Sequence, residues 1–102
     1  RLNFRSKYRA ADIEKKNNSI VPGALFEISK SDEKKLDVYE DFPILYKKMF
    51  FSYYNKKVMT YIMPNKTEFR YPTERYLNVI KRGYKDCKLN KSYLIKALNP
   101  NK

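Results

Sequence analysis

The sequence contains no histidine and a single cysteine, Cys87, among its 102 residues. Without histidine, this chain cannot build a Ser-His-Asp or Cys-His catalytic centre, and a conventional zinc site is excluded as well. One cysteine cannot form an internal disulfide, which suits a reducing, cytoplasmic environment. Any acid–base chemistry must therefore use Asp, Glu, Tyr or Lys side chains.

Other features are also missing. No apolar run approaches the roughly 20 residues of a membrane-spanning helix, so no membrane contact is expected, and no signal peptide is visible. There is no glycine-rich phosphate loop and no internal repeat. The hydrophobic share of 42% and aromatic share of 16% indicate a folded protein. A chain of this length is expected to form one domain, residues 1–102, with a single core.

Acidic residues are few, 11 against 23 basic ones, which gives a formal net charge of +12. A field of this sign attracts anions, including nucleic acid. However, lysines (17) outnumber arginines (6) and occur as scattered pairs, whereas base readout and bidentate phosphate contacts favour arginine. The pattern favours a solvated basic surface, with no specific nucleic-acid partner.

Alternating polarity and turn residues predict the order of the elements. The expected elements are a strand over Arg1–Arg5, a loop over Ser6–Ser19, a strand over Ile20–Ile28, a helix from about Asp32 to Glu40 or Asp41, a hairpin of Tyr46–Tyr54 and Lys57–Met63, a loop over Pro64–Pro72, a helix from Thr73 to a stop at Gly83, and a helix from Asn90 to Leu98.

The helix that ends near Glu40 organises the candidate chemistry. Ser31 is the expected cap, and Pro43 forces the chain out of helical geometry at the residue before it. On a 3.6-residue period Leu36 and Glu40 share one face, which places a carboxylate on the apolar side near the negative helix end. Burial on the apolar side and the negative helix end both disfavour the charged form of this carboxylate, so Glu40 is a candidate proton carrier. A solvated or lysine-paired glutamate is the structural alternative.

The hairpin carries bulky residues on both faces, which fits the wall of a barrel with helices outside. With a two-residue turn at Asn55-Lys56, Phe50 pairs with Tyr61, and Tyr46 lies on the same face but well separated along the strands. Gly23, one of only two glycines, is expected to meet a special backbone need: a bulge, a positive φ or the close approach of another group.

The ordered residues of these elements resemble the gamma-glutamylcyclotransferase-like family. The resemblance spans nearly the whole chain and rests on the following segments and residues: Arg1-Leu2-Asn3-Phe4, Val21-Pro22-Gly23-Ala24-Leu25-Phe26-Glu27-Ile28, Leu36-Asp37-Val38-Tyr39-Glu40, Pro43, Tyr46, Thr60-Tyr61, Pro72, Tyr76-Leu77, Gly83, Leu89, Tyr93 and Leu98. The fold it implies is α+β, a small mixed β-barrel with flanking short helices.

In that family the glutamate of the Leu-Asp-x-x-Glu motif is the catalytic base, which implies this role for Glu40. The implied substrate-binding residues are Gly23, Tyr46, Tyr61 and Tyr76, although aromatic packing is an equal alternative for the tyrosines. The implied reaction releases 5-oxoproline from a small γ-glutamyl compound, without a metal or organic cofactor. Two alternatives stay open: a small basic barrel that binds single-stranded nucleic acid, and a relative that is catalytically silent or acts on something else.

One departure concerns the start of the domain. The family begins with a strand and a Tyr-Gly-Ser-Asn loop that binds the substrate carboxylate, and no such tetrapeptide occurs here. The chain is therefore expected to be an incomplete domain, inactive on its own, with an open sheet edge that invites a homodimer or strand exchange.

Overall fold

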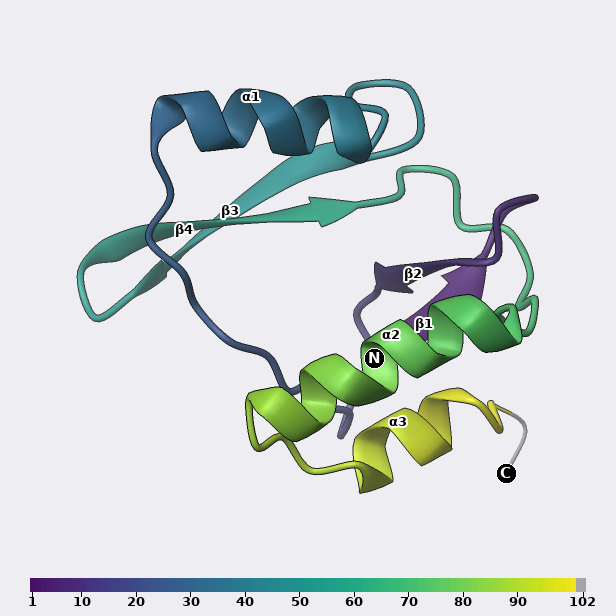
Figure 1. Ribbon diagram of the computed structural model, residues 1–102. Coiled ribbons are helices and arrows are strands. Elements are labelled where there is room, and N and C mark those ends of the chain that lie inside the picture. Colours follow the sequence, from purple (N-terminus) through teal and green to yellow (C-terminus); the bar gives the residue numbers. More distant parts are fainter. Residues whose placement is uncertain (101–102) are drawn as a thin grey trace. The chain divides into compact units, whose positions relative to one another are not determined.

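The computed structural model describes residues 1–100, which form an α+β fold of seven elements (Figure 1). In chain order these are β1 (Leu2–Arg5), β2 (Ala10–Ile13), α1 (Lys30–Tyr39), β3 (Lys47–Tyr53), β4 (Lys56–Ile62), α2 (Glu74–Asp86) and α3 (Ser92–Ala97). They belong to two compact units, residues 1–25 with 66–102, and residues 26–65. The α+β class is confirmed. The predicted mixed barrel is not found among residues 1–100, because the strands form two separate two-stranded antiparallel sheets.

The first unit packs β1 and β2 with α2 and α3. Its core consists of Phe4, Leu77, Tyr84, Leu94 and Ala97, all less than 9% exposed. The helical members share one face of their helices, since Leu77 and Tyr84 are two turns apart on α2 and Leu94 and Ala97 lie one turn apart on α3. Thr73 caps α2 by accepting a hydrogen bond from the Tyr76 amide, as expected for a helix that begins there.

A buried ionic cluster links the two strands of this unit. The Arg5 side chain, 2% exposed, contacts Asp12 at 3.2 Å and Glu14 at 2.7 Å, and it donates to the Thr67 carbonyl at 3.0 Å. Lys66 lies 2.7 Å from the fully buried Asp12 carboxylate. Buried charges persist only where such partners offset their lost hydration, so these contacts explain how charged residues occupy a strand interior.

The strand β2 was missed by the sequence analysis, which placed residues 10–13 in a loop. A four-residue turn after β1 brings Ala10 opposite Arg5, with a left-handed backbone at Ser6 (φ 72°) and Arg9 (φ 53°). The predicted strand over Ile20–Ile28 is also wrong, because this segment has no regular structure and most of its side chains are exposed.

The bulge or positive φ expected at Gly23 is not found, and the helix stop expected at Gly83 is wrong. Gly23 has no positive φ, belongs to no strand, and has open space where a Cβ would lie. Gly83 does not end α2, which continues to Asp86. The helix ends instead where Lys88 turns left-handed, and the Leu89 amide donates back to the Tyr84 carbonyl at 2.8 Å.

The second unit consists of α1 and the β3–β4 hairpin, with α1 lying along the hairpin (Figure 1). The helix begins two residues earlier than expected, because Ser29 rather than Ser31 is the cap and forms a reciprocal capping box with Asp32. The hairpin turns at Tyr54 and Asn55, both with positive φ, one residue before the predicted turn. The register therefore shifts by two, so that Lys48, not Phe50, lies opposite Tyr61.

Among residues 1–100, no helix is long and apolar enough to span a membrane.

Candidate active site

Glu40 is the C-cap of α1. Its amide donates to the Leu36 carbonyl at 2.8 Å, and the next residue, Asp41, turns left-handed (φ 51°), which ends the helix. The Glu40 side chain is partly buried, and burial raises the pKa of its carboxyl above the ordinary glutamate value. Within residues 26–65 no cation forms a salt bridge with it, so nothing there offsets the cost of its charge. The pattern of α1 predicted this environment, and the lysine-paired alternative is not observed within this unit.

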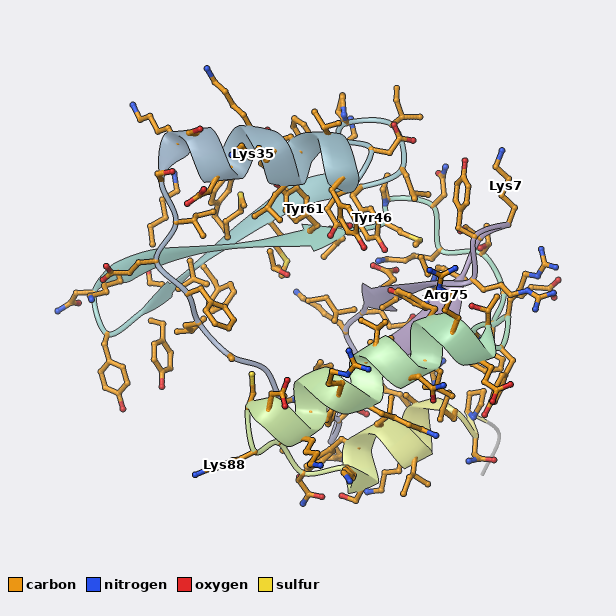
Figure 2. All side chains as sticks on the ribbon, in the orientation of Figure 1. Lys7, Lys35, Tyr46, Tyr61, Arg75 and Lys88 are labelled. Carbon is orange, nitrogen blue, oxygen red and sulfur yellow. The ribbon has the colours of Figure 1, made fainter. Side chains whose placement is uncertain are left out.

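Tyr46 and Tyr61 pack against each other on the hairpin (Figure 2). Their ring centroids are 6.4 Å apart with an interplanar angle of 77°, an edge-to-face arrangement, and Tyr46 is only 5% exposed. The two tyrosines were expected to be well separated along the strands. The observed register corrects this, because Lys48 pairs with Tyr61 and Tyr46 is two residues before Lys48.

A hydrogen-bond network joins α1 to the hairpin beside these rings. The Tyr61 hydroxyl donates to one oxygen of Asp37 at 2.5 Å, and the Lys48 ammonium donates to the other at 3.0 Å. Lys48 also donates to Glu33 at 2.6 Å, and its ammonium lies 4.5 Å from the centre of the Phe42 ring. These hydrogen bonds lower the pKa of the Asp37 carboxyl, and the bond from Tyr61 has a larger effect than the bond from Lys48.

The same network fixes the protonation state of Tyr61. Burial, the hydrogen bond to Asp37, and the negative charges of Asp37, Glu33 and Glu40 together raise the pKa of the Tyr61 hydroxyl far above its ordinary value. The phenol therefore stays protonated and directs its hydrogen to Asp37. Its oxygen keeps a lone pair that can accept a hydrogen bond from a ligand.

The local charge is opposite to that of the whole chain. Glu33, Asp37 and Glu40 all raise the Tyr61 pKa by their charge, and Lys48 is the one cation that forms salt bridges in this group. Three carboxylates against one ammonium leave the group net negative, on a chain of formal charge +12. A cationic group of a ligand is favoured here over an anionic one.

The other two predicted site residues belong to the first unit. The Tyr76 ring packs edge-to-face on Phe4 at 6.5 Å, and its phenolic oxygen accepts a hydrogen bond from the Ala11 amide at 3.1 Å. These contacts give Tyr76 a packing role in that unit. Gly23 lies in the irregular segment after β2 and is exposed. The structure thus groups Glu40, Tyr46 and Tyr61 in one unit, and it describes Tyr76 and Gly23 in the other.

Sequence reasoning did not identify Lys48 or Asp37 as members of this network. A signal for the acidic residues was present, since Glu33, Asp37 and Glu40 recur at helical spacing on one face of α1. No signal identified Lys48, because its place opposite Tyr61 depends on the hairpin register. Among the described residues, no group of three or more His, Cys, Asp or Glu side chains is arranged to hold a metal ion.

Comparison with curated proteins and with solved structures gave no match. Comparison with protein-family models gave a match to the model described as the AIG2-like family, over residues 20–98. This range contains all five predicted site residues and covers well over half of the chain. The chain therefore belongs to the AIG2-like family, part of the gamma-glutamylcyclotransferase-like superfamily that its motifs resemble.

Proposed function

We propose that this protein is a γ-glutamyl cyclotransferase that releases 5-oxoproline, with Glu40 as the general acid and base. The observation that carries the proposal is a partly buried carboxylate of raised pKa, unpaired within its unit, whose charge helps to raise the pKa of Tyr61, the tyrosine that packs on Tyr46. Family membership supports the same role, because Glu40 occupies the glutamate position of the motif that carries the resemblance.

The reaction requires proton transfer at two nitrogens. The substrate's α-ammonium gives up a proton, and the free amine attacks the γ-carbonyl carbon to form the carbon–nitrogen bond of a five-membered lactam. The bond from that carbon to the departing nitrogen then breaks. The attacking nitrogen loses two protons in all and the departing amine gains two, so the net reaction releases none. A single carboxylate with a raised pKa can carry these protons one at a time.

Positioning supplies a second part of the rate. A substrate folded so that its own amine lies near its carbonyl gains the proximity advantage of an intramolecular reaction. The Tyr61 oxygen, with its hydrogen held by Asp37, is suited to accept a hydrogen bond from the α-ammonium. The net negative group around it favours the same cation. Tyr46 orients Tyr61 by ring packing, and Gly23 and Tyr76 remain candidates for substrate contact through the resemblance alone.

The direct test is release of 5-oxoproline by the full-length protein from a panel of γ-glutamyl amino acids and γ-glutamyl amines. Turnover of at least one member, lost on Glu40→Gln, supports the proposal. A folded full-length protein that turns over none of them, and binds none by calorimetry, contradicts it. Tight, salt-sensitive binding of single-stranded oligonucleotides in the same preparation would favour the nucleic-acid-binding alternative.

A further inference from the structure

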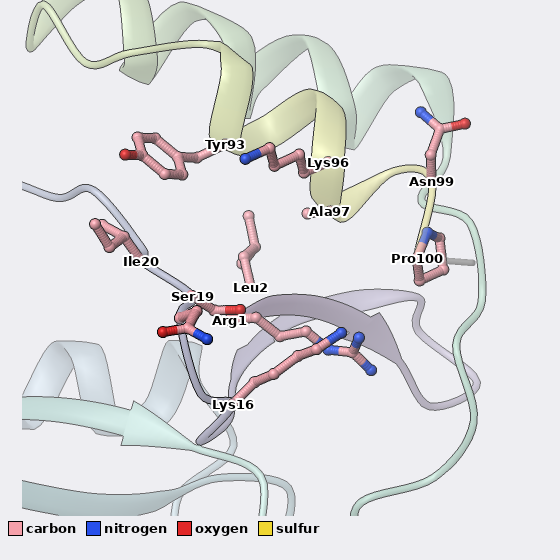
Figure 3. A pocket seen from close by; sticks show the side chains of 11 residues that line it. Arg1, Leu2, Lys16, Ser19, Ile20, Tyr93, Lys96, Ala97, Asn99 and Pro100 are labelled. Atoms are coloured by element: carbon pink, nitrogen blue, oxygen red, sulfur yellow. The ribbon is translucent and has the colours of Figure 1, made fainter. Parts of the chain in front are cut away.

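A pocket in the first unit lies between α3, the start of β1 and the segment that follows β2 (Figure 3). Its volume is about 170 Å³. At about 30 Å³ per water molecule, this space holds about six waters. Drug-sized ligand pockets start at about 300 Å³, so the space suits a small molecule and excludes a dinucleotide.

The charges around this pocket have one sign. Its lining includes Arg1, Lys16 and Lys96, and no acidic residue. Figure 3 shows Tyr93 and Lys96, which come from α3, on one side of Leu2, and Arg1 and Lys16 on the other. Arg1 is paired with Glu14, but neither Lys16 nor Lys96 forms a salt bridge among residues 1–100, so a bound anion would supply a counter-charge for these lysines.

One of the cations is held in place. The Arg1 guanidinium donates through Nε to Glu14 at 3.1 Å, and the same carboxylate oxygen accepts from Asn3 at 2.6 Å and from Arg5 at 2.7 Å. Arg5 is itself 98% buried, so this anchor is part of the folded core. An arginine fixed at one edge loses less side-chain entropy when its remaining N–H groups bind a ligand.

The remaining lining is apolar or aromatic. Leu2 and the nearly buried Ala97 provide aliphatic surface, and the Tyr93 ring has the Lys96 ammonium 5.7 Å from its centre. A bare inorganic ion would leave this surface unused. An anion that carries a small apolar or aromatic group would contact both parts of the pocket.

We propose that this pocket binds a small organic oxyanion, a phosphate ester or a carboxylate, with an attached apolar group of about the size of one ring. Glu40, Tyr46 and Tyr61 do not line this pocket, and they belong to the other unit. Binding at this pocket therefore does not depend on the proposed cyclotransferase activity.

Phenyl phosphate is the probe, and ¹H–¹⁵N amide spectra of the full-length protein locate its binding. Phenyl phosphate is expected to shift the amides of α3 and residues 16–20, phenol to bind at least tenfold more weakly, and inorganic phosphate also more weakly. Benzoate separates the two sources of the oxyanion: tighter binding than phenyl phosphate indicates a carboxylate ligand, and weaker binding indicates a phosphate ester.

The variant Lys16→Gln/Lys96→Gln removes two of the lining charges. It is expected to weaken phenyl phosphate binding roughly twofold to thirtyfold, because each exposed charge contact contributes about 0.2–1 kcal/mol. The control Lys34→Gln/Lys35→Gln removes the same charge from exposed positions on α1, and it should change binding less than twofold. Tyr93→Leu should reduce the preference for phenyl phosphate over inorganic phosphate.

Equal weakening in both double variants would overturn the proposal, because it would show attraction by net charge alone. Shifts spread over lysines of the whole surface, or phenol binding as tightly as phenyl phosphate, would overturn it too. Melting curves of each variant show that the fold is intact before the affinities are compared.

Discussion

Replacing Glu40 by Gln should remove activity and stabilise the fold at neutral pH. The substitution keeps the size of the side chain and deletes its charge and its proton-carrying ability. Loss of one general acid–base group costs about 10²–10⁴ in rate. At about 1.36 kcal/mol per tenfold, this corresponds to about 2.7–5.4 kcal/mol of transition-state stabilisation.

The gain in stability follows from the position of the charge. Glu40 is the C-cap of α1, at the negative end of the helix dipole, and no cation of its own unit offsets it. An unfavourable charge at a helix end costs about 0.3–1 kcal/mol. Recovering this energy should raise the melting temperature by roughly 1–8 °C for a domain of this size. The relief of burial adds to the gain, because the amide is easier to desolvate than a carboxylate.

The pKa of Glu40 determines how the stability difference between Glu40→Gln and the wild type changes with pH. Burial raises the folded-state pKa of Glu40 above the ordinary 4.5, so the folded protein binds this proton more tightly than the unfolded chain. The stability that Glu40 contributes is complete below the unfolded pKa, and it is lost as pH rises through the folded pKa. The Glu40→Gln variant and the wild type should therefore melt together at pH below 4.5 and diverge above it, with the variant more stable.

The assay combines 5-oxoproline release with melting curves across this pH range. Glu27→Gln is the matched control, because the Glu27 side chain is 98% exposed and the same change there should alter neither quantity. A Glu40→Gln variant with wild-type turnover would refute the catalytic role. A variant that is less stable than wild type at neutral pH would refute the description of Glu40 as an unfavourably placed charge.

The helices of the first unit could be predicted because their apolar stripes are local. The spacing of Leu77 and Ile80, and of Leu94 and Ala97, required no knowledge of distant residues. Helix ends were less predictable. Gly83 suggested a stop, yet α2 continues through it, because a glycine in a helix costs only about 1 kcal/mol and the packed stripe extends to Tyr84.

The strand β2 could not be predicted, because its stability depends on residues far away in the sequence. A charged residue such as Asp12 in a short segment predicts a loop. In the fold it is fully buried, where Arg5 and Lys66 compensate its charge. The ion pair with Lys66 spans 54 positions of the chain. Local polarity therefore gave the wrong structure for a segment whose partners are remote.

The candidate site was half predictable. The helical pattern predicted the partial burial and raised pKa of Glu40, since its environment depends on α1 itself. The proximity of Tyr46 and Tyr61 depends on the hairpin register, which one residue of the turn decides. Tyr54 adopts a left-handed backbone (φ 47°), which is uncommon for a residue of this kind, so Asn55-Lys56 looked like the better turn.

Three further predictions follow from particular contacts. Leu94→Ala should destabilise the protein by about 2–5 kcal/mol, because Leu94 is 2% exposed in the core. The control Ile95→Ala, at a neighbour that is 60% exposed, should change the melting temperature little. Equal effects of the two substitutions on the melting temperature would contradict the assigned core. Gly23→Val should leave the melting temperature unchanged, because the backbone φ of Gly23 is not positive and a Cβ there meets nothing within 4 Å. A large drop in melting temperature would show that the segment is packed more tightly than described. Lost activity at an unchanged melting temperature would instead indicate a substrate contact. Asp37→Asn should lower the pKa of Tyr61 toward its ordinary value, because it removes a negative hydrogen-bond acceptor, and ultraviolet titration of tyrosinate measures this shift. The same variant should reduce 5-oxoproline release less than Glu40→Gln does, because Asp37 orients Tyr61 and transfers no proton itself. A Tyr61 titration that is unchanged in Asp37→Asn would show that the hydrogen bond between them does not hold the phenol in place.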